Sequence, residues 1–86
     1  MDMRVLVGEN VRRTRKLRGL TQEKFAEKSG FSQQYLSSLE NGKRNPSVIT
    51  LFEIAVALDV LPGDLLRPRP RRSEPKRRPE RASRKQ

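Results

Sequence analysis

The chain has 86 residues, which allows one small domain, and its 20 Lys and Arg against 10 Asp and Glu give a formal net charge of +10. The absence of Cys and His excludes disulfides, thiolate nucleophiles, the usual zinc sites and most general-base chemistry. No stretch resembles a signal peptide or approaches the roughly 20 apolar residues of a membrane span. We therefore expect a soluble, cytoplasmic protein that is not an enzyme and has no metal, cofactor or small-molecule ligand.

The positive charge is concentrated at the C-terminus. Residues 67–86 carry ten Lys and Arg against two Glu, a net charge of +8, whereas residues 1–66 carry ten against eight, a net charge of +2. The C-terminal stretch holds four Pro and no aromatic residue, so it cannot bury enough apolar surface to offset the entropy lost on ordering. We predict a folded domain over residues 1–66 and a disordered, basic, Arg- and Pro-rich tail over residues 67–86.

Helical periodicity runs through the first 66 residues, without the alternation that is typical of strands. Capping and turn residues divide this part into five short helices, so the predicted fold class is all-α. The expected helices run from about Val5 to Arg18, from Gln22 to Ser29, from just after Ser32 to about Asn41, from Val48 to about Leu58, and from Pro62 to Leu66. The predicted N-caps are Thr21, Ser32 and Ser47, and the predicted helix stops are Gly19, Gly30 and Gly42.

The second and third helices, at about residues 22–41, meet at a turn with distinctive chemistry. Gly30 tolerates the positive φ that a tight turn requires, and Ala26 is small enough for the two helices to cross closely. The apolar side chains available for the wedge between these helices and the core are Phe25, Phe31, Leu36 and Leu39. Spacing, residue size and turn chemistry together are typical of a helix-turn-helix that reads duplex DNA.

An ordered set of residues extends the pattern beyond the turn. Its members are Arg15, Gly19-Leu20-Thr21-Gln22, Ala26, Gly30, Ser32, Leu36-Ser37, Leu39-Glu40, Gly42, Asn45-Pro46-Ser47, Leu51 and Ile54-Ala55. On these residues the chain resembles the lambda-repressor-like, XRE/Cro family of helix-turn-helix proteins over about Val7 to Leu66. The resemblance implies a small bacterial or phage transcriptional regulator, a repressor or autoregulatory controller associated with the nucleoid. It also implies that the third helix reads a pseudo-palindromic operator in double-stranded DNA through the major groove.

The resemblance assigns roles to individual positions. Gln22, at the N-terminus of the second helix, would contact a phosphate and brace the reading helix. The candidate contacts on the third helix, where glutamine can pair with adenine through two hydrogen bonds, are Ser32, Gln33, Gln34, Ser37 and Ser38. Lys43 and Arg44 would hold the DNA backbone. Further candidates are Tyr35, Asn41 and Asn45. Arg15 and Glu40 match a structural pair that links the first and third helices.

The helix expected at residues 48–58 carries two apolar stripes. The stripe predicted to face the core comprises Val48, Leu51, Ile54, Ala55 and Leu58. The second stripe, at positions that are often polar or charged in the family, comprises Ile49, Phe52 and Val56. Together with Leu61, this second stripe is predicted to form the interface of a homodimer. In the alternative, the N-terminal segment Met1-Met3-Val5 folds over the same stripe.

Other interpretations of these features remain open. Gln33 and Gln34 could lie on a solvated helix face without contacting DNA, and the ring of Tyr35 could be partly buried. The tail could be a solvated charge run, or an electrostatic arm whose contribution fades steeply with salt. Two other classes of protein are an antitoxin that also binds a toxin partner and an RNA binder in which the tail dominates.

Overall fold

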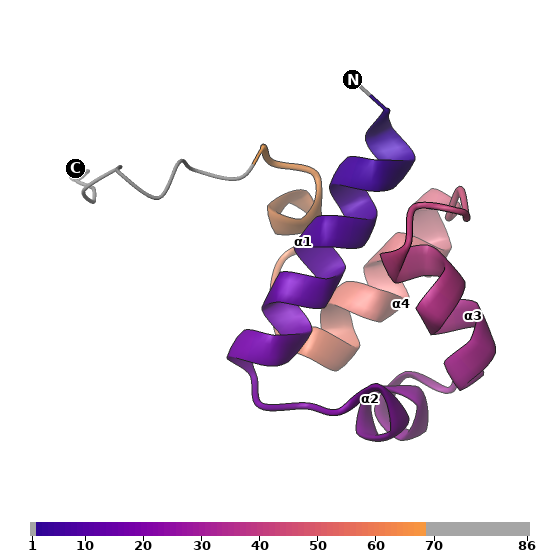
Figure 1. Ribbon diagram of the computed structural model, residues 1–86. Coiled ribbons are helices and arrows are strands. Elements are labelled where there is room, and N and C mark those ends of the chain that lie inside the picture. The colour runs from indigo at the N-terminus through magenta and orange to yellow at the C-terminus, as the bar shows by residue number, and fades with distance from the viewer. Residues whose placement is uncertain (1, 69–86) are drawn as a thin grey trace, which may run out of the picture.

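The computed structural model describes residues 2–68, which form four α-helices and one 3-10 turn (Figure 1). The elements are α1 (Met3–Leu17), α2 (Gln22–Ser29), α3 (Gln33–Glu40), α4 (Val48–Leu58) and the 3-10 turn η1 (Pro62–Leu65). No strand occurs within this part of the chain, so the all-α prediction is confirmed for it. None of its helices is long and apolar enough to cross a membrane. The predicted disorder of the basic tail concerns residues that, after Pro68, lie outside those described.

Two of the predicted elements differ from the observed ones. α1 begins at Met3 and not near Val5, because the carboxylate of Asp2 accepts a hydrogen bond from the backbone N–H of Arg4 at 3.0 Å and so caps the helix. The predicted fifth helix is not an α-helix. η1 is a single 3-10 turn, since its backbone hydrogen bonds join residues three apart, as in the bond from the N–H of Leu66 to the carbonyl of Gly63 at 3.1 Å.

The predicted caps and stops are confirmed. The side chains of Thr21, Ser32 and Ser47 each accept a hydrogen bond from the backbone N–H three residues further on. Gly30 ends α2 with a φ of 82°, in the left-handed region that favours glycine. These local signals therefore place the start of α2, α3 and α4 where the sequence predicts.

Each element contributes to one hydrophobic core. The buried members of this core are Val7, Val11, Phe25, Leu36, Leu39, Leu51, Ile54, Ala55, Ala57, Leu58 and Leu65. α1 packs against α3 on one side and η1 on another, while α4 packs against α2 and η1 (Figure 1). One core prediction is wrong: Val48 is 83% exposed, because it is the first residue of α4 and projects before the point where the core begins.

Two buried residues of α1, neither of them singled out from the sequence, position this helix. Gly8 lies so close to the C-terminal end of α3 that a Cβ atom on it would sit 2.8 Å from the carbonyl oxygen of Glu40 and closer still to that of Leu39. Asn10 is fully buried, and its Nδ2 donates to the carbonyl oxygens of Leu65 at 2.9 Å and Arg67 at 2.7 Å. α1 therefore holds α3 at one face and the chain after η1 at another.

Candidate nucleic-acid interface

The candidate interface is built from α2, the turn at Gly30 and α3. Phe25 of α2 and Leu36 and Leu39 of α3 are fully buried, as the predicted wedge requires, and Phe31 is partly buried against the same core. α2 packs against both α3 and α4. Because the apolar side of α3 faces inward, its polar side is left on the surface of the domain.

The predicted DNA-contacting residues lie along this polar side and just beyond it. Gln33 and Gln34 are exposed in the first turn of α3, while Ser37 and Ser38 are half-buried further along. The hydroxyl oxygen of Ser32 accepts the backbone N–H of Tyr35 at 3.0 Å, which leaves its own O–H free to donate. The residues that follow α3 and are exposed are Asn41, Lys43, Arg44 and Asn45. One surface thus gathers amide, hydroxyl and cationic groups, which are the usual partners of base edges and phosphates.

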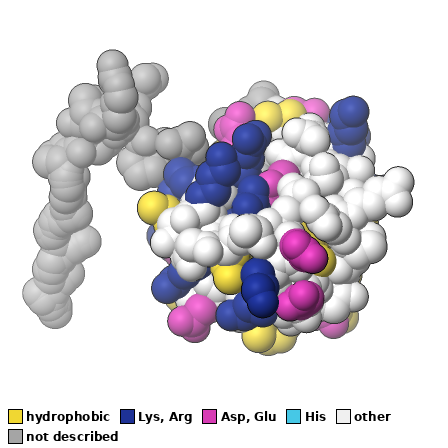
Figure 2. All heavy atoms as spheres, turned by 60° about the horizontal axis from the view of Figure 1, so that its bottom comes forward, with side chains coloured by type: hydrophobic (Ala, Val, Ile, Leu, Met, Phe, Trp, Pro, Cys, Tyr) yellow, Lys and Arg dark blue, Asp and Glu magenta, His cyan; other side chains and the backbone are white. Residues whose placement is uncertain are grey.

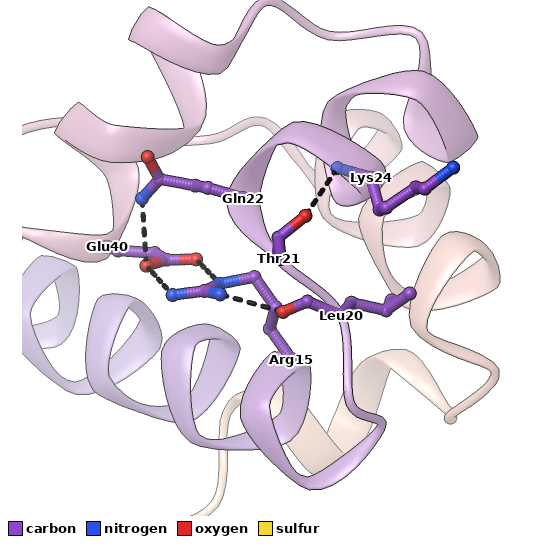
Figure 3. A network of polar contacts seen from close by, with 6 residues as sticks. All are labelled: Arg15, Leu20, Thr21, Gln22, Lys24 and Glu40. Carbon is purple, nitrogen blue, oxygen red and sulfur yellow. Dashed lines mark hydrogen bonds and ion pairs between the residues drawn. The ribbon is translucent and has the colours of Figure 1, made fainter.

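A buried polar network holds α3 in place (Figure 3). Arg15 of α1 donates from Nε to Glu40 Oε2 at 2.7 Å and from Nη2 to Glu40 Oε1 at 3.2 Å, and from Nη1 to the Leu20 carbonyl at 2.8 Å. The side chains of this pair are only 11% and 3% exposed. The two residues predicted as a structural pair therefore join α1 to the C-terminal end of α3 through two parallel hydrogen bonds.

Gln22 extends the network to α2. Its Nε2 donates to Glu40 Oε1 at 3.2 Å, so the first residue of α2 is tied to the last residue of α3 (Figure 3). This bond corresponds to the bracing role expected of Gln22. An amide nitrogen carries two hydrogens, and the one not directed at Glu40 can serve the second role, a phosphate contact, which stays a prediction.

Charge alone does not mark the interface. In Figure 2, which brings the lower end of Figure 1 with α2 toward the viewer, Lys and Arg side chains lie among Asp and Glu side chains. α2 itself pairs Lys24 Nζ with Glu27 Oε1 at 3.7 Å on its exposed surface. No group of acidic, His or Cys side chains able to hold a metal occurs in the described part of the chain. The features that mark the candidate interface are therefore the hydrogen-bonding groups of α3 and the cations that follow it.

The second apolar stripe of α4 is exposed. Ile49, Phe52, Val56 and Leu61 are between 54% and 69% exposed. The alternative in which the N-terminal segment covers this stripe is wrong for the described residues: Met3 lines a small surface pocket with Pro46 and Leu66, and Val5 lies against Gly42. Met1 lies outside the described residues. The stripe remains an apolar surface without a cover in residues 2–68.

One contact near the interface could not be predicted from the sequence. Tyr35 is half-buried, and its ring stacks on that of Phe31 with centroids 5.3 Å apart and planes at 27°. The guanidinium of Arg44 lies over the same Tyr35 ring, with Cζ 5.4 Å from the ring centroid. No local sequence signal predicts this, because it depends on the direction that the chain takes after Gly42.

Comparisons with known proteins agree with this architecture. Residues 11–65 match the helix-turn-helix family model HTH_3. The chain is 62% identical over 68 residues to y4dJ, an uncharacterized HTH-type transcriptional regulator of Sinorhizobium fredii, covering 79% of this chain and 88% of that protein. These matches span most of the described residues.

Two solved structures are similar as well. The restriction-modification controller protein C.AhdI from Aeromonas hydrophila aligns with a TM-score of 0.69 and 37% identity, over 72% of this chain and 94% of that one. The biofilm regulator SinR in complex with DNA aligns with a TM-score of 0.67 and 35% identity, over 71% of this chain and 98% of that one. Such relatives do not favour the antitoxin or RNA-binding alternatives. The chain belongs to the HTH_3 family of helix-turn-helix transcriptional regulators, the lambda-repressor-like, XRE/Cro type that its sequence resembles.

Proposed function

We propose that this protein binds a two-fold symmetric DNA operator as a homodimer, with α3 of each subunit in the major groove, and so represses a promoter or controls its own expression. The observation that carries the proposal is the exposed polar side of α3, held by the buried network of Arg15, Glu40 and Gln22. No chemical reaction is involved, and the protein acts at the nucleoid by occupying DNA. The similarity to a restriction-modification controller supports an autoregulatory role.

Each exposed group has a role in this arrangement. Gln33 and Gln34, in the first turn of α3, reach base edges, because the N-terminal residues of a recognition helix enter the groove first. The remaining candidate contacts on or beside α3 are Ser32, Ser37, Ser38, Asn41 and Asn45. Lys43 and the free N–H of Gln22 contact phosphates on either side of the groove. The complex with DNA formed by SinR, a structural relative, supports this docking.

The exposed stripe Ile49, Phe52, Val56 and Leu61 is proposed to pair with the same stripe of a second copy. A two-fold interface is self-complementary, so a single apolar patch suffices for both subunits. It would place two copies of α3 at half-sites roughly 10 to 10.5 bp apart, one turn of the double helix. The two-fold symmetry of such a dimer is the reason to expect a pseudo-palindromic operator.

Sedimentation of a matched pair of variants tests the dimer. Phe52→Glu places a charge in the stripe, whereas Leu17→Glu places the same charge at an exposed apolar position on another helix, α1. We expect Phe52→Glu to be monomeric and Leu17→Glu to remain dimeric, with the same helix content by circular dichroism. A Phe52→Glu protein that is still dimeric would rule out this interface.

Selection of bound duplexes from a random DNA library tests the proposed function as a whole. The full-length protein is compared with a chain that ends at Pro68, which keeps the contact of Asn10 with Arg67. If the basic tail only adds sequence-independent affinity, both proteins enrich the same symmetric site, and the full-length protein shows the steeper dependence on salt. Failure of both proteins to enrich any motif would contradict sequence-specific regulation.

A further inference from the structure

Arg44 is held differently from its neighbour Lys43, although both follow α3 and both are exposed. Its guanidinium carbon lies 5.4 Å from the centre of the Tyr35 ring, which belongs to the first turn of α3. The side chain of Arg44 therefore runs back along the reading helix, from beyond its C-terminal end to its N-terminal half.

The ring of Tyr35 is itself fixed. It stacks on Phe31 at 5.3 Å, and both rings pack against the hydrophobic core. The turn at Gly30 fixes the backbone just before these two rings, and the cap at Ser32 fixes the backbone between them. Arg44 thus lies on an aromatic platform, the stacked pair of Phe31 and Tyr35, that is rigid relative to α3.

Stacking on a ring occupies the flat face of a guanidinium and leaves its N–H edges available. Within residues 2–68, no hydrogen bond or ion pair of the Arg44 side chain competes for those edges. Two parallel N–H groups match two adjacent acceptor atoms, and the O6 and N7 atoms of guanine in the major groove form such a pair, as do two phosphate oxygens. The position beside the first turn of α3, where base-reading residues lie, favours the guanine.

We propose that Tyr35 is a positioning residue that presents the N–H edge of Arg44 to a guanine in each half-site, so that Arg44 determines sequence preference and does not merely hold the backbone. This inference rests on the proposed docking of α3 in the major groove. It divides the two cations after α3 into a base reader, Arg44, and a phosphate contact, Lys43.

The test measures the affinity of the full-length protein for its selected operator and for every single base-pair variant of that operator. Arg44→Ala is expected to lose discrimination at one base pair per half-site, about tenfold or more for a bidentate contact with guanine. Arg44→Lys keeps the charge and can still donate to guanine, but it lacks the planar fork that the Tyr35 ring orients, so it is expected to lose part of the same discrimination. Lys43→Ala, the matched control, is expected to weaken binding to all sequences by one factor and to reduce the salt slope by about one phosphate contact.

Variants of Tyr35 test the platform. Tyr35→Phe keeps the ring face and is expected to discriminate as the wild type does. Tyr35→Leu removes the ring, and we expect it to lose discrimination at the same base pair as Arg44→Ala, with no further loss in the double variant. Thermal unfolding shows whether Tyr35→Leu is folded, and the two Arg44 variants, at an exposed position, do not depend on that result.

Three results would overturn the inference. One is uniform weakening by Arg44→Ala with a reduced salt slope, which is the signature of a phosphate contact. Another is full retention of discrimination in folded Tyr35→Leu. Both of these leave the proposed function intact. A wild-type protein that prefers no base pair at all would instead refute the proposed function, and this inference with it.

Discussion

Gly8 is the position at which one added methyl group tests the packing of α1 against α3. Glycine in the middle of a helix is less favourable than alanine by about 1 kcal/mol, so local propensity predicts that Gly8→Ala stabilises the protein. The structure predicts the opposite. The new Cβ would lie 2.8 Å from the carbonyl oxygen of Glu40 and still closer to that of Leu39. Both are backbone atoms, so no change of side-chain rotamer can relieve the clash.

The magnitude follows from two opposing effects. Forcing an extra methyl group into a packed interior costs about 2 to 3 kcal/mol, since the upper part of the usual range applies where backbone must move. The gain in helix propensity offsets about 1 kcal/mol of this cost. We therefore expect Gly8→Ala to lower the free energy of unfolding by about 1 to 2 kcal/mol and the melting temperature by roughly 5 to 15 °C for a domain of this size.

Thermal and urea denaturation measure this change. Gly63→Ala is the control, because no heavy atom lies within 4 Å of its added Cβ and its φ is not in the left-handed region. We expect the control to be neutral. Because the clash would push α3 away from α1, Gly8→Ala should also weaken operator binding at temperatures where it is folded. A Gly8→Ala protein as stable as the wild type, or more so, would refute the close approach of the two helices.

Substitutions at three further positions test other contacts. Glu40→Ala leaves the Arg15 guanidinium buried without its carboxylate, so urea denaturation should show a loss of about 3 to 5 kcal/mol; no loss would mean that the pair is open to solvent. Asn10→Ala removes two hydrogen bonds from a fully buried amide to backbone carbonyls, and we expect unfolding to become easier by about 2 kcal/mol, with Asn10→Asp intermediate at best. The side-chain hydrogen bond from Arg4 lowers the pKa of Asp2 from its ordinary value of 3.8. The stability that this hydrogen bond contributes is present above pH 3.8 and lost as the pH falls through the lowered pKa of Asp2. Asp2→Asn is therefore expected to be less stable than the wild type at pH 7 and equally stable at low pH, and a deficit independent of pH would contradict this assignment.

Local features of this fold could be predicted from the sequence because their causes lie within a few residues. Thr21, Ser32 and Ser47 each cap a helix through a bond to an N–H three residues on, and Gly30 provides the positive φ of the turn. The exposed face of α3 follows from the same local pattern. The start of α1 at Met3 is not evident from the sequence although its cap, Asp2, is equally local, because the apolar periodicity becomes clear only at Val5.

The features that the sequence could not show are those decided by distant segments. From the sequence alone, Gly8 is only a residue that weakens a helix, and its close approach to α3 is not evident. Likewise, the sequence suggests that Asn10 is a surface residue, whereas its side chain donates to the carbonyls of Leu65 and Arg67. The contact of Arg44 with Tyr35 depends on the path of the chain beyond α3. The spacing of Val48 fits the apolar stripe that faces the core, but spacing does not tell where along a helix the core begins, and Val48 is exposed.

α3, the proposed reading helix, is fixed at both ends and exposed along its outer side. Its C-terminal end is held by Gly8, against the backbone of Glu40, and by Arg15, which binds the side chain of the same residue. Its N-terminal end is held by the cap at Ser32 and the ring of Tyr35. A buried ion pair gains little net stability after its desolvation, so the main contribution of Arg15 is to geometry.

Substitutions on the outer side of α3 should therefore change sequence preference without changing stability, whereas substitutions that disturb its ends should change both. Substitution of Gln33 or Gln34, which are exposed, should change which base pairs are preferred while the free energy of unfolding stays the same. Substitution of Gly8 or Arg15 moves the whole helix, and with it Gln22, which donates to the same carboxylate. Such variants should lose stability, affinity and preference together, because the groups proposed to contact bases and those proposed to contact phosphates are then displaced as one body.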